Sequence, residues 1–578
     1  MYYINYFFKF FIFFLSNLGY WELLRKKVKI NSYFLPSLTV AFQVSCLYFA
    51  GLFNVLYEVS ILIWIGGVLL LIYNYGHSME IINQYKKVGY IYLIFTIAVL
   101  LLYLRGKMFV HYDNFSHWAL VVKQMLSTNR YPNFEDTVIM FKEYPLGSAT
   151  YIYYVATFVG KSEAIQMFAQ AYMIVVCLVP IFIYCKRNKF FSCAFMFFIT
   201  NFIFIYNIRI TDLLVDTLLP IVSMNALLYV YIYGSGNKNG EVSYKELFCT
   251  IPFLIQILQI KNSGIFFCII ASVWVLLGIK NDKAFYGRIL TALSPYLTLL
   301  LWHKHCDYVF DSSAITKHAM TAENYKAIVG NKTMQDIKNI SDSMFKFSLM
   351  WKDIWFFILC LLALGVISYF VVKKCRQSFS ILFVGSVILY VMYQMGTFLM
   401  YLFSMPKEEA LNLSGVSRYS KTVSLAIFYV IVLLCIKIFS ELQLKNRTDM
   451  VSILAIWGIV AFCQKNVMGQ FTTIFTYNSF SVEKRWMEDV KNRYNIPSDS
   501  SYCILIKEEN DPGYIYYLGK YVFQSNDFKT VLNATEDSIN STGQANYILT
   551  YDKENQVIQD WVKLNYPNQA GNDVIIRE

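Results

Sequence analysis

Charged residues are scarce in this chain of 578 residues: only 15% are Asp, Glu, Lys or Arg, whereas 57% are hydrophobic. An ordinary soluble protein has about 25% charged and about 45–50% apolar residues. The composition therefore argues against a soluble enzyme, a disordered scaffold and a secreted disulfide module. It predicts repeated apolar runs near the roughly 20 residues needed to cross a bilayer. We expect a polytopic membrane protein.

Several motifs of well-known chemistry are also missing. The 12 cysteines include no CxxC pair, and the chain has no GxSxG, HExxH, P-loop or GxGxxG motif. These absences argue against a cysteine metal or redox centre, a serine hydrolase, a zinc protease, an ATP-driven pump and a Rossmann sugar-nucleotide transferase. The net charge of +12 does not indicate nucleic-acid binding, because basic clusters lie in short loops between apolar runs.

About fourteen apolar runs divide most of the chain into predicted membrane crossings. They cover residues 5–20, 33–53, 58–75, 88–105, 164–184, 190–208, 213–233, 246–260, 263–279, 286–302, 353–371, 379–403, 422–438 and 450–468. If two separate helices flank Lys261, the basic clusters all fall on one side, as the positive-inside rule requires. The outer loops 106–163, 303–352 and 404–421 and the C-terminal tail then lie on the extracytoplasmic side.

This map predicts three regions. They are N-terminal transmembrane helices at 1–87, a transmembrane catalytic module at 88–469 and a small extracytoplasmic domain at 470–578. Strand-like runs in the last region lie at Tyr502–Ile506, Tyr547–Thr550 and Val574–Ile576, with an amphipathic helix at Gln556–Leu564. Such spacing predicts an α/β fold, and the region is long enough to bury its own core. We interpret it as an accessory domain that binds the acceptor or covers the site.

The first long outer loop carries residues suited to catalysis. Asp113 directly follows a predicted crossing, where a carboxylate can be partly desolvated and still reach a water-borne substrate, as suits a general base. We expect Asn114 to be the N-cap of a helix that lies in the membrane interface and runs to about Leu126. In the alternative interpretation, Asp113 only complements the helix dipole, and His117 with Trp118 anchors the chain at headgroup level.

The residues that follow this helix extend the pattern. Glu143-Tyr144-Pro145-Leu146-Gly147 leads into an apolar run that ends at Gly160 and is too short for an ordinary crossing. The order is a crossing, an acidic residue, an interfacial helix, an aromatic-Pro-Leu turn, a second interfacial helix and a crossing that ends in basic residues. This order resembles the GT-C superfamily of membrane glycosyltransferases, over roughly residues 88–305 and more weakly to about 440.

The resemblance implies roles for particular residues. Asp113 matches the acidic position that the family uses as a catalytic base or as a metal-associated carboxylate. Tyr144-Pro145-Leu146 resembles the Pro-Pro-Leu turn of the family, with Tyr144 in place of the first proline. Asn114 stands where a second acid often follows, which argues against metal dependence. We therefore expect no cofactor, with a divalent metal as the less favoured alternative.

Charged residues at predicted outer helix ends complete the candidate site. Arg209, Asp212 and Asp216 lie between two crossings, and the i, i+4 spacing predicts both carboxylates on one helical face. They would orient the sugar or the acceptor hydroxyl, or else form a closed network with Arg209. Lys261 would face a lipid-linked phosphate if the resemblance holds, or would simply snorkel to the interface. Arg418 can hold phosphate oxygens in a bidentate way.

One further cluster is a weaker candidate for a metal site. His303, His305 and Asp307 alternate at the start of the second long outer loop. Such spacing suits a divalent metal only in an extended strand, and a predicted helix precedes the cluster, so the metal interpretation is disfavoured.

Together these patterns predict an inverting glycosyltransferase in an integral membrane protein, with a GT-C-like helical fold. The donor would be a sugar on a polyprenyl-phosphate or diphosphate carrier, and the acceptor a cell-surface glycan, lipid or protein. A bias toward Ile, Phe, Tyr, Lys and Asn favours a bacterial source and hence the plasma (inner) membrane. A transporter or flippase for a lipid-linked saccharide is less favoured because midplane positions are almost uniformly apolar. A polysaccharide polymerase or ligase is the third alternative.

Overall fold

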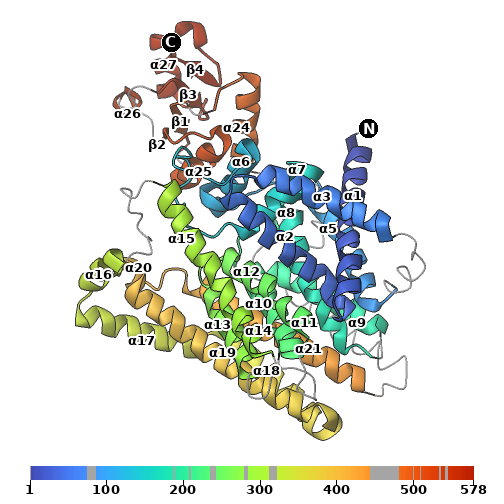
Figure 1. Cartoon of the computed structure of the whole chain (residues 1–578). Coiled ribbons are helices and arrows are strands. Elements are labelled where there is room, and N and C mark those ends of the chain that lie inside the picture. The colour runs from blue at the N-terminus through green and yellow to red at the C-terminus, as the bar shows by residue number, and fades with distance from the viewer. Residues whose placement is uncertain are drawn as a thin grey trace.

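The computed structural model is mostly helical and carries one small sheet near the C-terminus (Figure 1). It describes residues 2–74, 86–186, 189–206, 210–234, 243–278, 284–310, 322–442, 481–498, 500–507, 509–532, 535–540 and 545–577.

Seven helical segments of the described chain are long and apolar enough to cross a membrane. They are Tyr6–Lys27, Ser32–Leu52, Leu56–Asn74, Glu163–Tyr184, Lys352–Val371, Lys373–Phe403 and Val416–Glu441. Shorter apolar helices at Val88–Leu104, Lys189–Phe204, Leu218–Gly234 and Gly264–Leu277 coincide with further predicted runs. These helices indicate a polytopic helical membrane protein. The run predicted at 450–468 lies outside the described residues.

Helices from the whole length of the chain form the bundle. Those of its first half are α1 (Tyr2–Lys27), α2 (Leu35–Leu52), α3 (Leu56–Asn74), α5 (Val88–Leu104), α8 (Glu163–Leu178), α9 (Lys189–Tyr206), α10 (Leu218–Tyr229), α11 (Tyr244–Phe248), α12 (Thr250–Ile260) and α13 (Gly264–Leu277). They are followed by α14 (Phe285–Leu293), α15 (Leu297–Val309), α16 (Ala322–Gly330), α17 (Met334–Met350), α18 (Lys352–Val366), α19 (Arg376–Phe403), α20 (Lys407–Leu411) and α21 (Val416–Glu441). Helix α14 packs on α13, and α21 packs on α10. Two separate helices, α12 and α13, pack against each other on either side of Lys261, as the charge pattern required.

The first long loop contains an irregular helical turn, η3 (Asn114–Trp118), followed by α6 (Ala119–Thr128) and α7 (Gly147–Val159). The predicted apolar face of the first of these helices is buried: Phe115, Ala119 and Met125 have no exposed side-chain surface. Helix α7 packs against α2, α6 and α8, so the first long loop contains two short helices, as predicted.

A four-stranded sheet forms the core of the C-terminal region. Its elements are α24 (Val482–Arg493), β1 (Tyr502–Ile506), α25 (Pro512–Phe523), β2 (Phe528–Leu532), α26 (Glu536–Asn540), β3 (Tyr547–Thr550), α27 (Gln556–Asn565) and β4 (Val574–Ile576). The strand order is β2-β1-β3-β4, with β1 parallel to both neighbours and β4 antiparallel to β3. The strands and helix that the sequence indicated are present, whereas β2 and α25 were not anticipated.

The C-terminal domain lies against the first long loop (Figure 1). The Phe115 ring lies 5.2 Å from the Tyr521 ring of α25. Lys484 of α24 places its Nζ 2.5 Å from a carboxylate oxygen of Glu163, at the start of α8. Residues 106–163 and the sheet domain therefore occupy the same end of the bundle.

Basic residues gather at the other end of the same helices. Helix α1 ends in Arg25, Lys26 and Lys27, while its first residues lie near the C-terminal domain. Lys186 follows the helical segment Glu163–Tyr184 and pairs with Glu441 at the end of α21 at 2.6 Å. The spatial separation of the two ends agrees with the alternation of charge along the sequence.

The bundle interior is more polar than the apolar sequence pattern suggested. Asn17, Gln43, Asn225 and Gln256 are all buried. Gln43 donates a hydrogen bond to the side-chain oxygen of Asn17 at 3.3 Å. Within the described chain, the side-chain nitrogen and oxygen atoms of Asn225 and Gln256 have no hydrogen-bond partner. Helices α10 and α12, which carry these amides, pack against each other.

Candidate functional site

Four charged residues that are far apart in the sequence meet at the end of the bundle below the C-terminal domain. Asp113 precedes η3, and Asp216 lies in the loop before α10. Lys261 directly follows α12, and Arg418 lies in the first turn of α21. Arg418 Nη1 is 3.2 Å from Asp113 Oδ2, and its Nε is 3.7 Å from Asp216 Oδ2. Lys261 Nζ is 2.7 Å from Asp216 Oδ1. We call these four residues the charged cluster.

The charged cluster is buried at its base and open at its edge. The Asp216 side chain is only 3% exposed, whereas that of Arg418 is 43% exposed. Asp216 thus pairs with both cations on the buried side of the cluster. The Arg418 guanidinium keeps exposed surface that a ligand can reach. The Tyr419 ring lies 5.3 Å from Lys261 Nζ, within cation–π range.

A glycine turn sets the direction in which Arg418 enters the cluster. Gly415 has a φ of 77°, in the left-handed region that favours glycine, immediately before α21 begins. The Arg418 backbone N–H donates to the Gly415 carbonyl at 3.0 Å. The first turn of α21 is therefore fixed where the side chain meets Asp113.

Asn114 does not have the N-cap role expected from the sequence. Asp113 already has helical φ and ψ angles, so the helix begins before Asn114. The buried amide instead donates from Nδ2 to Asp212 Oδ1 at 3.2 Å and accepts from the Leu213 N–H at 2.9 Å. The Asn114 side chain therefore bonds to the distant Asp212–Leu213 segment and not to the first turn of its own helix.

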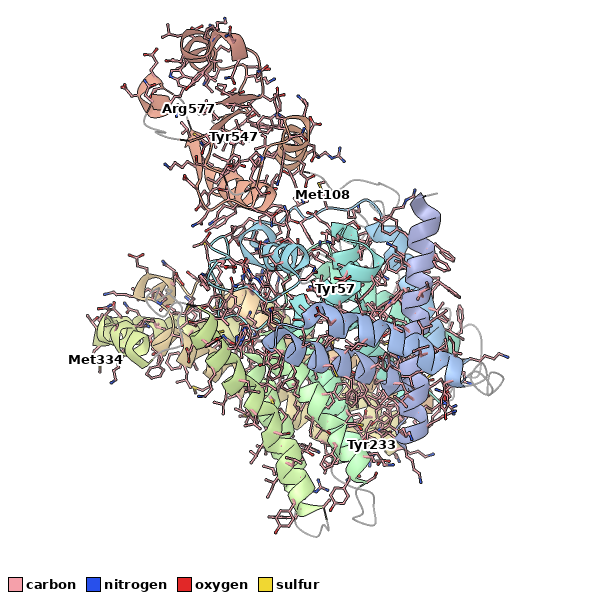
Figure 2. The ribbon with its side chains drawn as sticks, turned by 45° about the horizontal axis from the view of Figure 1, so that its top comes forward. Tyr57, Met108, Tyr233, Met334, Tyr547 and Arg577 are labelled. Carbon is pink, nitrogen blue, oxygen red and sulfur yellow. The ribbon has the colours of Figure 1, made fainter. Side chains whose placement is uncertain are left out.

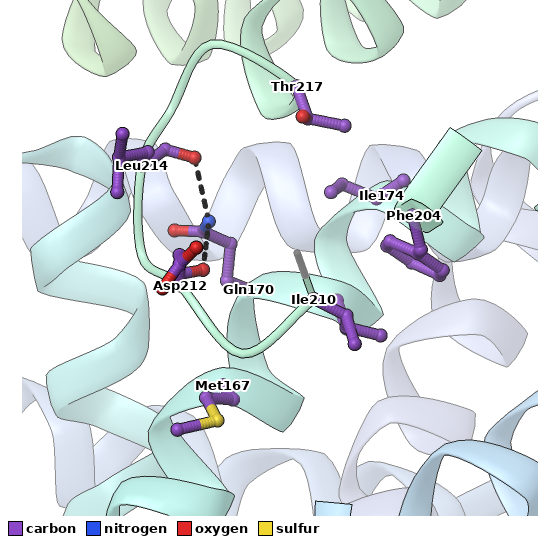
Figure 3. A pocket seen from close by; sticks show the side chains of 9 residues that line it. Met167, Gln170, Ile174, Phe204, Ile210, Asp212, Leu214 and Thr217 are labelled. Carbon is purple, nitrogen blue, oxygen red and sulfur yellow. Dashed lines mark hydrogen bonds between the residues drawn. The ribbon is translucent and has the colours of Figure 1, made fainter. Parts of the chain in front are cut away.

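The prediction that Asp212 and Asp216 share a helical face is wrong. Helix α10 begins only at Leu218, and both acids lie in the preceding loop. Figure 3 shows Asp212 in this loop. The loop cannot continue the helix because its backbone is held from outside: Gln170 of α8 donates to the carbonyls of Asp212 and Leu214 at 3.3 and 3.1 Å. As a result, Asp216 faces the two cations while Asp212 faces Asn114.

Arg209 lies outside the described residues. The predicted network between Arg209 and the two acids therefore stays a prediction.

His117 and Tyr144 belong to an aromatic group beside the charged cluster. Their ring centroids are 5.0 Å apart, and Trp118 stacks on Tyr144 at 6.0 Å. Burial lowers the pKa of His117 to about 3, so its imidazole is neutral at physiological pH. Burial also raises the pKa of Tyr144, and the neighbouring Tyr419 adds to the effect. His117 consequently packs the site and supplies no charge to it.

Close backbone packing ties the Tyr144-Pro145-Leu146 turn to the end of α12. Gly147 begins α7 against Gln259, two residues before Lys261. A Cβ at Gly147 would lie 2.6 Å from the Gln259 Cβ and 2.7 Å from its carbonyl oxygen. Only glycine permits this approach.

His303, His305 and Asp307 all lie on α15, which is helical through Val309. A helix directs residues two positions apart to different sides, so this trio does not form the alternating ligand set considered for a metal. His305 stacks on Trp302, with ring centroids 5.6 Å apart. Within the described chain, no group of three His, Cys, Asp or Glu side chains could hold a metal ion.

Gln170 and Tyr419 support the site, and neither role was predicted from the sequence. Gln170 is an uncharged polar residue within an apolar run, and Tyr419 follows a recognised arginine. A buried amide inside a predicted crossing is costly unless it is used, and this was the available signal for Gln170. Nothing in the local pattern paired Asn114 with a loop about a hundred residues away.

A scan against models of protein families and a search of curated proteins found no match to this chain. The fold defines a class: a polytopic helical membrane protein with a charged cluster at the bundle end that faces a small α/β domain.

Proposed function

We propose that this protein is a GT-C-like glycosyltransferase that moves a sugar from a polyprenyl-phosphate or polyprenyl-diphosphate carrier to a glycan, lipid or protein acceptor. One observation carries the proposal: a carboxylate, Asp113, stands 3.2 Å from an exposed arginine that shares a buried aspartate with a lysine. Base and phosphate-binding cations are thus within reach of one bound molecule.

In the proposed reaction, Asp113 accepts the proton of the acceptor hydroxyl. The acceptor oxygen attacks the anomeric carbon of the sugar, and the bond from that carbon to the phosphate oxygen breaks. The carrier phosphate leaves with the bonding electrons. Arg418 and Lys261 stabilise the negative charge of that phosphate, which needs no protonation by an acid.

Asp216 acts as a positioning residue. It is buried and contacts both cations, so it fixes the distance between Arg418 and Lys261. Tyr144 and the neutral His117 form a wall of the site, suited to stacking on a sugar ring. No step requires a cofactor.

The proposed topology follows the charge distribution. The basic end of the bundle faces the cytoplasm and the C-terminal domain lies outside, in a bacterial plasma membrane with about fourteen crossings. The domain over the first loop then serves acceptor binding or water exclusion.

A second candidate function is translocation of a lipid-linked saccharide. The buried, unpartnered amides of Asn225 and Gln256 favour it, because polar groups inside a membrane bundle are costly and often mark a substrate path. The charged cluster lies at one end of the bundle and not along its length, which favours the transferase.

Reconstitution of the purified protein in liposomes separates the two functions. We expect transfer of a sugar from an extracted polyprenyl-linked donor pool, with release of the carrier phosphate, detected by mass spectrometry. Movement of a fluorescent carrier analogue between leaflets without sugar transfer would overturn the proposal. Gln256→Leu should abolish movement in a transporter and should leave transfer by a transferase largely intact.

A further inference from the structure

A second cavity, of about 940 Å³, lies between the helical bundle and the C-terminal domain. Its walls come from the start of α1, the end of α5, the start of α8, α6 and the helices α24 and α25. None of the charged cluster lines it. Met108, one of its lining residues, lies at the junction between domain and bundle (Figure 2).

Basic side chains outnumber acidic ones in the lining of this cavity. Arg105, Lys107, Lys123 and Lys161 line it together with two acids, Glu163 and Glu488. Glu163 is engaged by other groups, since it accepts from Lys484 at 2.5 Å and from the Tyr521 hydroxyl at 2.7 Å.

Two lysines of the cavity wall, Lys123 and Lys161, donate hydrogen bonds to backbone oxygens. Lys161 Nζ donates to the Leu126 carbonyl at 3.0 Å, and Lys123 Nζ donates to the Tyr521 carbonyl at 2.5 Å. Hydrogen bonds to carbonyl groups satisfy donors without cancelling charge. The two acids of the lining therefore do not pair with Lys161, and the basic side chains of the wall outnumber the acidic ones.

Apolar side chains also line the cavity: Tyr6, Phe10, Leu101, Leu104 and Phe168. The neighbouring side chains Phe7 and Phe11 of α1 are 75% and 51% exposed, as expected for a face in contact with lipid. The cavity therefore lies beside a helix face that is suited to contact with lipid.

We propose that this cavity binds an anionic glycerophospholipid, with its phosphate held by Arg105 and Lys161 and an acyl chain against Phe10 and Leu101. Charge complementarity selects the phosphate, and the apolar wall requires a lipid. The volume is near the upper end of the usual range for small-molecule sites, about 300–1,000 Å³. A lipid bound there would join the bundle to the C-terminal domain without touching the charged cluster.

Native mass spectrometry of the full-length protein in detergent tests this inference. Phosphatidylglycerol and phosphatidylcholine of matched chains are the probes. We expect one phosphatidylglycerol to remain bound where phosphatidylcholine does not. Arg105→Gln/Lys161→Gln should weaken its binding at least about tenfold, as loss of charge-assisted hydrogen bonds implies.

Lys373→Gln/Lys374→Gln, at the basic end of the bundle, is the matched control and should leave binding unchanged. The single variant Lys161→Gln changes an exposed side chain, so its partial loss of binding can be measured in a folded protein. Equal retention of both lipids, unchanged binding in the double variant, preferential binding of polyprenyl phosphate or full competition by inorganic phosphate would each overturn the assignment. Lipid binding is read independently of sugar transfer, so this inference and the proposed function can fail separately.

Discussion

Asp216 shows how a single buried residue organises the charged cluster. Its carboxylate is 2.7 Å from Lys261 and 3.7 Å from Arg418, and its side chain is 3% exposed. Removal of one partner from a buried ion pair leaves the other charge uncompensated, which is strongly destabilising. The two cations therefore depend on Asp216 for their positions.

We expect Asp216→Asn to raise the KM for the lipid-linked donor by about tenfold or more, because Lys261 and Arg418 lose their shared anchor. Donor titrations in the transfer assay measure this change. Asp489→Asn, an exposed acid of the C-terminal domain, is the control. An unchanged donor KM in Asp216→Asn would show that the pairing has no positioning role.

The neutral state of the His117 imidazole leads to a prediction about the pH dependence of transfer. Because burial lowers its pKa to about 3, the folded protein keeps the imidazole neutral across the working range. We expect His117→Phe to retain most activity and to leave the pH profile of kcat unchanged between about pH 6 and 8. Loss of a kinetic pKa in that variant would mean that His117 transfers a proton.

The four residues of the charged cluster, Asp113, Asp216, Lys261 and Arg418, were all predicted site residues, because charges at the ends of apolar runs are conspicuous in the sequence. It misplaced Asn114 and paired Asp212 wrongly with Asp216, since the partners of both residues come from distant segments. Side-chain hydrogen bonds between segments leave no trace in local periodicity.

Among the elements, the turn before α7 connects two parts of the site. Gly147 lets α7 approach α12 where Gln259 leads to Lys261. One close contact therefore fixes the turn that carries Tyr144 against the end of α12 that leads to Lys261. Addition of one carbon at Gly147 tests whether this contact matters for the site.

We expect Gly147→Ala to lower both the stability and the transfer rate, because the added carbon meets Gln259 backbone as well as its side chain. Overpacking of this kind typically costs about 1–3 kcal/mol. Gly385→Ala in α19 is the control, since a Cβ added there would have no atom of the described chain within 4 Å. Equal thermal unfolding midpoints for the two variants would contradict the tight contact.

Helices and strands were largely predictable from apolar runs and turn residues. The predicted runs near 88–105, 263–279 and 353–371 match helices within a few residues, and β1, β3 and β4 have the predicted bounds. The loop at 210–217 was not predictable, because Gln170 of another helix holds its backbone open. The edge strand β2 alternates poorly and gave no clear signal.

For the molecule as a whole, the C-terminal domain is joined to the bundle through buried charges. Lys123 of α6 faces Glu163, Lys484, Glu488 and Lys491. Burial, with a smaller effect of Lys491, lowers the pKa of Lys123 to about 7. Between that value and 10.5 the unfolded chain binds more protons at this position than the folded one.

The free energy of unfolding should therefore rise with pH as pH increases from about 7 toward 10. Lys123→Met removes this titration and should flatten the rise between about pH 7 and 9. Thermal unfolding in detergent across this range measures the difference. Identical pH slopes for the wild-type protein and the variant would contradict the buried state of Lys123.

The most direct test of the central claim is the transfer rate of Asp113→Asn. The variant keeps the size of the side chain and its proximity to Arg418 but cannot accept the acceptor proton. We predict a loss of about 10²–10⁴-fold in turnover, with normal membrane insertion and donor binding, while Glu135→Gln in the same loop stays active. Wild-type turnover in Asp113→Asn would contradict the assignment of this cluster as a glycosyl-transfer site.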